Sequence, residues 1–293
     1  MFGRQKTGSV VCRSCGGLNG VSAEACFYCG ARNPGVFGFG GMLRGFGKDL
    51  GLAPSIITVC IVAFGMSLAL DPGGIGMQGL MNILSPSLEA GERMGSSGII
   101  PVWENGRWWT VLSAGWLHGS LLHIFFNMYW VRFLIPQVAE LYGVARTVIV
   151  YVLSSVIGFL ASSSVPVAIL WVAPGMQGVL RVFPGFGLYT LGASAALMGL
   201  WGSLIYYGQR TGSANLRTWA WRNTVYLLAF GFMMRGVDNW AHLGGLAGGW
   251  LVARFLDPLQ PERNNHAVIA VLCLVASAAA VAASLLIPLP ILD

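Results

Sequence analysis

Residues 108–143 decide the fold and read WWTVLSAGWLHGSLLHIFFNMYWVRFLIPQVAELYG. From 117 to 138 this stretch is long and apolar enough for a membrane helix, since a span needs roughly 20 mostly apolar residues. It nevertheless carries His118, His123 and Asn127. Polar side chains inside a span are costly and therefore mark function by default. His123 and Asn127 are four residues apart, which predicts that they share one helical face.

The composition of the whole chain also indicates a membrane protein. Of 293 residues, 55% are hydrophobic and 10% are charged, and the mean hydropathy is +0.68. Soluble domains carry about 25% charged residues. The net charge of +6 is spread among the polar segments, which argues against a nucleic-acid partner. The first 50 residues lack the apolar core of a signal peptide, so we expect the first span to direct insertion.

Six further apolar stretches predict six more spans around this helix. They cover residues 54–70, 145–170, 189–207, 224–234, 240–255 and 267–287. We expect a polar connection over 208–223 and a long loop over 71–116, with tryptophans suited to the membrane interface. The predicted organisation is a head at 1–34, a Gly-rich linker at 35–50, a six-span core at 51–257, and a connection with a seventh span at 258–293.

The distribution of basic residues predicts the orientation. With seven spans the two ends of the chain lie on opposite sides of the membrane. If the head is cytoplasmic, the inner segments hold 13 of the 17 Lys and Arg residues. Inner segments of membrane proteins are enriched in these residues, so we expect a cytoplasmic head and an outer C-terminus.

Four of the six cysteines form two matching Cys-x-x-Cys pairs, namely Cys12, Cys15, Cys26 and Cys29. The similarity extends further, because CRSCGGLN (12–19) and CFYCGARN (26–33) share Cys, Cys, Gly and Asn at the same places. Two such turns can aim four thiolates at one zinc ion. Two disulfides are the alternative, but thiols stay reduced in the cytoplasm. We therefore predict a structural zinc ribbon with no open position for catalysis.

A serine and a histidine from different spans form a second candidate site. Ser194 begins a predicted helix after a Gly/Pro-rich loop, where backbone N–H groups and the positive dipole end suit an oxyanion. His242 is the only histidine within the last three predicted spans and is the natural base. Small residues would let these two helices approach closely. They are Ala195 and Gly199 on one helix and Gly245 and Gly249 on the other.

Each of these residues also has an ordinary structural interpretation. A serine beside glycine in a membrane helix is most often a packing residue. A single membrane histidine often makes only structural hydrogen bonds. No pair of carboxylates lies at mid-span, which argues against an intramembrane aspartyl protease. The joint arrangement, rather than any one residue, favours a Ser–His site.

These motifs resemble those of the rhomboid family of intramembrane serine proteases. Residues 108–143 resemble the family's second-span signature of two histidines and an asparagine. GAS at 192–194 resembles its nucleophile motif, and AHLGGLAGG at 241–249 resembles its catalytic histidine followed by glycines. The resemblance covers residues 50–257. It implies an all-α, polytopic fold with a six-helix rhomboid-like core, here followed by a seventh transmembrane helix.

Carried over to this chain, the resemblance implies a Ser–His dyad without an acidic third member. Ser194 would be the nucleophile and His242 the general base. His123, Asn127 and the Ser194 backbone N–H would form the oxyanion hole, with His118 stabilising the site. Catalysis would need no cofactor. The expected substrates are single-span membrane proteins, and the expected location is a bacterial plasma membrane.

Three positions depart from the family's pattern. Ala195 replaces the usual glycine after the nucleophile, Thr110 replaces an arginine that often follows the loop tryptophan, and Met198 replaces a frequent aromatic. They keep open the alternative of an inactive rhomboid-like protein that binds membrane clients. A small-molecule transporter is a further alternative, but it predicts paired repeats with broken helices, which the sequence lacks.

Overall fold

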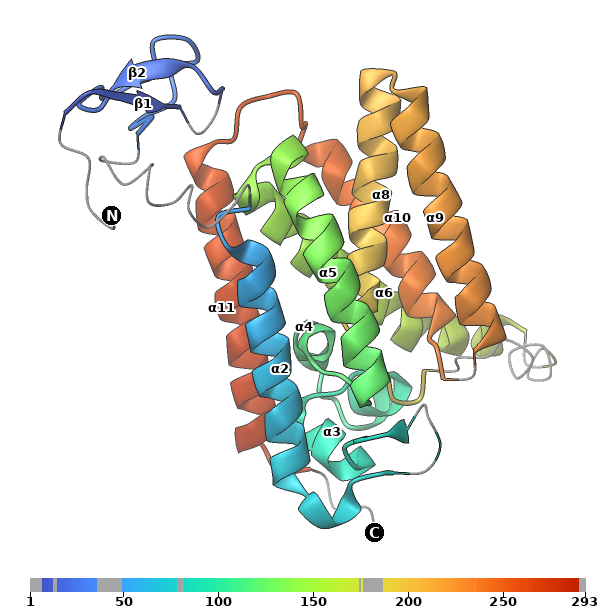
Figure 1. Cartoon of the computed structure of the whole chain (residues 1–293). Coiled ribbons are helices and arrows are strands. Elements are labelled where there is room, and N and C mark those ends of the chain that lie inside the picture. The colour runs from blue at the N-terminus through green and yellow to red at the C-terminus, as the bar shows by residue number, and fades with distance from the viewer. Residues whose placement is uncertain are drawn as a thin grey trace.

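A computed structural model of the chain describes residues 7–12, 15–35, 49–77, 79, 82–173, 175, 187–234 and 236–289. Within these ranges seven long helices form a bundle, and a small antiparallel hairpin lies beyond one of its ends (Figure 1). The helices are α2 (Leu52–Leu70), α5 (Leu121–Tyr142), α6 (Val144–Val172), α8 (Ser194–Thr211), α9 (Ala214–Met233), α10 (Asn239–Phe255) and α11 (Asn264–Leu286). The hairpin pairs β1 (Ser9–Val11) with β2 (Leu18–Gly20).

The predicted spans correspond to these helices except at α9. This helix begins at Ala214 rather than near Thr224, so the expected polar connection over 208–223 is wrong for most of its length. Hydropathy detects only the apolar part of a helix, whereas alanine, leucine and arginine favour helix beyond it. The Ser213 side chain accepts the Leu216 N–H and marks the true start. The predicted linker and the Gly/Pro-rich loop before α8 lie largely outside the described residues.

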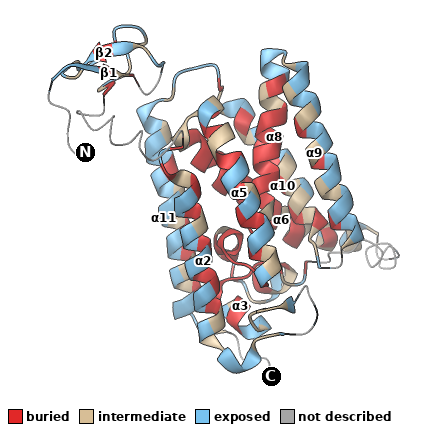
Figure 2. Ribbon diagram, viewed as in Figure 1, coloured by how far each residue is buried: buried red, intermediate tan, exposed pale blue. Residues whose placement is uncertain are grey.

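The surface of the bundle is apolar where lipid would contact it. Length and composition alone qualify three of the described helices, α2, α6 and α11, to cross a membrane. The outward faces of α2, α9 and α11 are exposed, while α6 and α8 are largely buried (Figure 2). Exposed side chains such as Phe125, Tyr226 and Leu272 would be unfavourable in water. Their placement fits a protein surrounded by lipid.

Helix α8 occupies the centre of the bundle because small residues let α10 approach it. A Cβ at Gly245 would collide with the Ala195 carbonyl oxygen, and one at Gly249 would collide with the Gly199 carbonyl oxygen. The predicted close approach of these two helices is therefore confirmed. Both helices run in the same direction, and Ala195 in the first turn of α8 lies against Gly245 in the second turn of α10.

The connection between α2 and α5, expected as a long loop, is a compact folded unit. It contains the short helices η2 (Pro72–Gly74), α3 (Leu88–Met94), η4 (Ile100–Glu104), α4 (Thr110–Ser113) and η5 (Ala114–Trp116). Ser97 and Thr190 exchange two backbone hydrogen bonds of 2.9 and 2.7 Å. The Ile99 N–H also donates to the Gly187 carbonyl oxygen at 2.8 Å. These bonds join the connection to the segment that leads into α8.

The head and the start of α8 lie at opposite ends of the bundle (Figure 1). Residues 29–32 of the head border a cavity of about 430 Å³, together with residues 260–264 and Ala267. The Arg146 guanidinium fixes the turn that leads into that second segment, donating to the carbonyl oxygens of Leu256, Asp257 and Gln260 at 3.0, 2.8 and 2.9 Å. Helix α10 ends beside this region, whereas His242 lies in its first turn, at the far end.

Candidate active site and metal centre

Ser194 is the first residue of α8, and the start of this helix is uncapped. Ala193 precedes it and has no side chain that could accept a backbone N–H. The first hydrogen bond of the helix runs from the Leu197 N–H to the Ala193 carbonyl oxygen at 3.0 Å. The N–H groups of residues 194–196 therefore have no partner within the helix.

The other six long helices are treated differently. In each, a side chain accepts a backbone N–H at the helix start: Asp49 for α2, Ser120 for α5, Glu262 for α6, Ser213 for α9, Asp238 for α10 and His266 for α11. Among the seven long helices that the structure describes, α8 alone lacks such an acceptor. A buried helix start without partners calls for an explanation, and a site for a negatively charged group is the natural one.

His123 borders the space beside Ser194. Its Nδ1 accepts the Gly119 N–H at 3.3 Å. A neutral imidazole has one donor and one acceptor nitrogen, so Nε2 carries the proton. A Cβ at Gly192 would lie 2.7 Å from His123 Nε2 and 3.7 Å from Ser194 Oγ. The Nε2 donor and the serine hydroxyl thus lie around one point, which only glycine leaves open.

Asn127 and His118 lie on either side of His123. The Asn127 side chain is buried, and its Nδ2 donates to the His123 carbonyl oxygen at 3.0 Å. That bond uses one of its two N–H groups, and the other remains for a ligand. His118 is also buried and packs edge-to-face against His123, with ring centroids 5.2 Å apart. The structure therefore groups all three second-span candidates.

His242 lies in the first turn of α10, where its N–H donates to the Asp238 carbonyl oxygen at 3.1 Å. Its Nδ1 is buried and has no hydrogen-bond partner among the described residues. Ser194 and His242 are each partly exposed, although their helical neighbours Ala195 and Ala241 are buried. No hydrogen bond joins Ser194 to His242 within the described part of the chain. Catalytic hydrogen bonds are often long in ligand-free proteins and shorten when substrate binds.

Asp238 anchors the start of α10, a contact that the sequence pattern did not predict. Its carboxylate accepts the Ala241 N–H at 2.9 Å and the Ser162 hydroxyl of α6. These bonds fix the first turn of α10, and with it His242. The available signal was an aspartate directly before an apolar helix, which is a helix-start signature.

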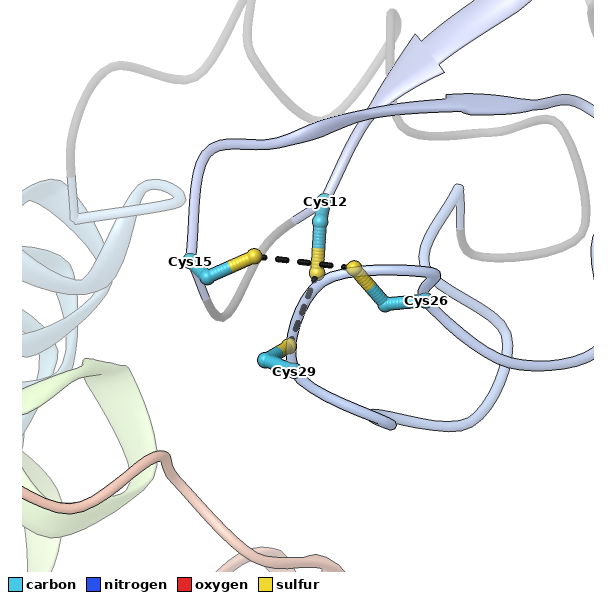
Figure 3. A group of neighbouring side chains, drawn as sticks. All are labelled: Cys12, Cys15, Cys26 and Cys29. Carbon is cyan, nitrogen blue, oxygen red and sulfur yellow. Dashed lines mark hydrogen bonds between the residues drawn. The ribbon is translucent and has the colours of Figure 1, made fainter.

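The four head cysteines come together as predicted (Figure 3). Their Sγ atoms all lie within 4.8 Å of one another, with Cys12–Cys29 at 3.8 Å and Cys15–Cys26 at 3.5 Å. A disulfide would need about 2.05 Å. A Zn–S bond of about 2.3 Å in tetrahedral geometry separates the sulfurs by roughly 3.8 Å. The donor set and its spacing therefore fit one zinc ion.

The two knuckles have the same backbone construction, which confirms the similarity seen in the sequence. The first cysteine of each accepts the N–H of the glycine four residues later: Gly16 to Cys12 and Gly30 to Cys26, both at 2.9 Å. Its own N–H donates at 2.8 Å to the carbonyl oxygen five residues later, that of Gly17 or Ala31. Gly16 and Gly30 have φ of +75° and +71°, which glycine adopts readily.

Hydrogen-bond donors surround the Cys26 Sγ. Burial raises the pKa of its thiol, but the backbone N–H groups of Cys29 and Tyr28 and the Asn19 amide outweigh this effect and lower that pKa to about 6. The Asn19 Nδ2 lies 3.3 Å from the Cys26 Sγ. Thiolate is the form that binds zinc.

Comparison with known proteins identifies the helical part of the chain. Residues 105–258, more than half of the chain, match the family described as "Rhomboid domain". Rhomboid protease GluP of Bacillus subtilis is 29% identical over 154 residues, which are 52% of this chain and 26% of that protein. Rhomboid-like protease 3 of Toxoplasma gondii is 29% identical over 182 residues, 61% of this chain and 64% of its own. RHOMBOID-like protein 5 of Arabidopsis thaliana is 32% identical over 189 residues, which are 61% of this chain and 53% of that protein. This chain covers less than two thirds of each of these relatives.

Proposed function

Because this chain belongs to the rhomboid family, we propose that it is a serine endopeptidase that cleaves transmembrane segments through a Ser194–His242 dyad. The relatives' names as rhomboid proteases support the reaction class. The single observation that carries the assignment of the site is the uncapped start of α8 at Ser194.

Each residue of the site has one role in the proposed reaction. Ser194 Oγ attacks the carbonyl carbon of the scissile peptide bond, and His242 takes its proton. His242 then gives that proton to the leaving amine, and water hydrolyses the acyl-enzyme by the reverse steps. The negative oxygen of each tetrahedral intermediate would accept hydrogen bonds from the Ser194 N–H, His123 Nε2 and the remaining Asn127 N–H. Such donors stabilise charge that exists only near the transition state.

The departure at Ala195 has a local compensation. The Ala195 methyl group points at Gly158 of α6, where an added Cβ would lie 2.9 Å from it. Because Gly158 on α6 has no side chain, there is room for the Ala195 methyl group at the position where the family usually has glycine. The altered motif is compatible with the close packing of α6, α8 and α10.

The protein is a multi-pass integral membrane protein. We assign it seven spans, α2, α5, α6, α8, α9, α10 and α11, with the head in the cytoplasm of a bacterial cell and Ser194 near the outer face. Its substrates would be single-span proteins whose helices unwind readily near that face, since a peptide bond in a regular helix is shielded. The head would hold a structural zinc, and catalysis would need no cofactor.

The deciding experiment combines a serine-directed fluorophosphonate probe with a model single-span substrate in detergent. Wild-type protein should react with the probe at Ser194 and cleave the substrate near the outer end of its helix. Ser194→Ala should do neither while remaining folded. Binding of the substrate without cleavage or labelling would identify an inactive rhomboid-like protein instead.

A further inference from the structure

We propose that the last turn of α11 is a latch that positions Ser194 through the connection between α2 and α5. The latch consists of Ser284 on α11 together with Arg107 and Trp109 on that connection. Ser284 and Trp109 are then positioning residues, acting on the nucleophile through the backbone between them. The proposal rests on the proposed function for its catalytic consequence. Its structural part stands independently, because α11 lies outside the residues that match the family.

Arg107 joins the connection to the end of α11. Arg107 is 2% exposed, and its guanidinium donates to the carbonyl oxygens of Glu92 at 2.8 Å and Ser284 at 2.9 Å. The carbonyl groups in the last turn of a helix lack partners within it and form the negative end of its dipole. A buried guanidinium is costly unless such acceptors surround it. Among the described residues, the Ser284 carbonyl oxygen is therefore one of two acceptors that the Arg107 guanidinium contacts.

Trp109 and Gly95 complete the contact. The Trp109 Nε1 donates to the Ser284 hydroxyl at 3.0 Å. A Cβ at Gly95 would collide with that same hydroxyl and with the Ser113 hydroxyl, which itself donates to the Gly95 carbonyl oxygen at 2.7 Å. The end of α11 thus lies directly against the backbone where α3 ends and α4 begins.

From Gly95 the path to the nucleophile is short. Ser97 pairs with Thr190 through two backbone hydrogen bonds, and Thr190 lies four residues before Ser194. Downstream of the latch, the Ala114 carbonyl oxygen accepts the Gly192 N–H at 2.9 Å. Gly192 is the residue whose missing side chain leaves the space between His123 and Ser194 open. The segment that carries the nucleophile is therefore attached on both sides to the unit that α11 holds.

The test compares two serines on one helix. Ser284→Ala removes the acceptor for Trp109. Ser277→Ala is the matched control, since Ser277 is similarly buried and, within the described ranges, its hydroxyl bonds only the Cys273 carbonyl oxygen of its own helix, at 3.0 Å. Trp109→Phe removes the donor and keeps a ring in place. The first measurement is the rate at which a fluorophosphonate labels Ser194. The second is the rate of tryptic cleavage after the exposed Arg93 of α3. This measurement does not depend on any catalytic activity of the protein itself.

Ser284→Ala and Trp109→Phe should each slow labelling and speed tryptic cleavage by about fivefold, the effect of one buried hydrogen bond. The double variant should be no worse than either single variant, because both remove the same bond. Ser277→Ala should match wild type in both rates. The thermal midpoints of Ser284→Ala and Trp109→Phe should lie within a few degrees of the wild-type midpoint, so that the folded protein is what is being compared.

Each other outcome overturns something definite. Equal labelling and cleavage rates for Ser284→Ala and Ser277→Ala would reject the latch. Faster tryptic cleavage with unchanged labelling would reject the positioning of Ser194 and leave only a structural contact. If wild-type protein is not labelled at all, the proposed function fails, and tryptic cleavage alone then decides whether α11 holds the connection.

Discussion

The two ends of this molecule satisfy their polar groups in opposite ways. In the head, four thiol groups point at one centre, and each knuckle repeats the same pair of backbone hydrogen bonds. At the other end, α8 begins with N–H groups that meet no side-chain acceptor among the described residues, and Gly192 leaves a space between His123 and Ser194. A centre whose positions are all filled can stabilise a fold but has nothing left for a substrate. A centre with unused donors costs stability and can bind a developing charge.

The largest effect on turnover should come from the end of the molecule that holds Ser194 and the uncapped start of α8. Replacing Ser194 or His242 by alanine should reduce turnover by on the order of 10⁶-fold, the loss typical of removing a serine protease nucleophile or base. Turnover of a single-span substrate and the thermal midpoint are the measurements. Ser203→Ala is the matched control on the same helix, because the one partner of the Ser203 hydroxyl among the described residues is the Leu200 carbonyl oxygen, at 2.7 Å. Activity in Ser194→Ala beyond a trace would rule out the proposed mechanism.

The unused donors should have the next largest effect. His123→Ala or Asn127→Ala should lower kcat by about 10²- to 10³-fold, with little change in KM, because these donors act on the transition state. Asn223→Ala is the control, since the Asn223 amide makes the same bond to a carbonyl oxygen of its own helix, at 2.8 Å. A change confined to KM would instead place His123 and Asn127 in substrate binding.

The packing between the two ends should show an intermediate effect. Gly249→Ala should destabilise the protein and lower activity several-fold, because the new methyl group meets the Gly199 carbonyl oxygen, and overpacking typically costs about 1–3 kcal/mol. Gly65→Ala on α2, where nothing lies within 4 Å of the added Cβ, should be neutral or slightly stabilising. The two thermal midpoints distinguish close helix approach from a general effect of glycine replacement.

The smallest effect on cleavage should come from the head with its four cysteines. Chelation of zinc, or replacement of Cys12 and Cys26 by serine, should unfold the head, because so short a segment buries too little apolar surface to fold without metal. Metal analysis should find one zinc per wild-type chain and none in the variant. Turnover in detergent should change by less than about twofold, since the head lies far from Ser194. Loss of all turnover with a folded core would show that the head is required for catalysis.

The sequence predicted the head and the helices of the site well because both depend on local pattern. Two Cys-x-x-Cys turns with matching glycines specify their own geometry, and small residues four apart predicted the contact between α8 and α10. The start of α9 was missed because Trp219 and Arg222 lie in a helical segment that hydropathy does not report. That α8 lacks a cap was not predicted, because it requires knowing what surrounds Ala193.

The contacts of the connection between α2 and α5 could not have been predicted. Trp109 bonds a serine 175 positions away, on a helix whose sequence is mostly alanine, valine and leucine. Nothing distinguishes Ser284 from Ser277 by pattern, although only Ser284 meets another element through its hydroxyl group. Long-range pairs of this kind depend on the packed fold rather than on any local signal.

The bare start of α8 also sets durability against activity. A serine, threonine or aspartate before a helix typically adds about 1 kcal/mol to its stability. Position 193 instead holds an alanine that is wholly buried, so the protein forgoes that gain at its most central helix. Selection for a robust fold alone would favour a capping side chain there, and that side chain would occupy the N–H groups that the proposed oxyanion site uses. Variants evolved for heat resistance at this position should therefore be the ones that lose turnover.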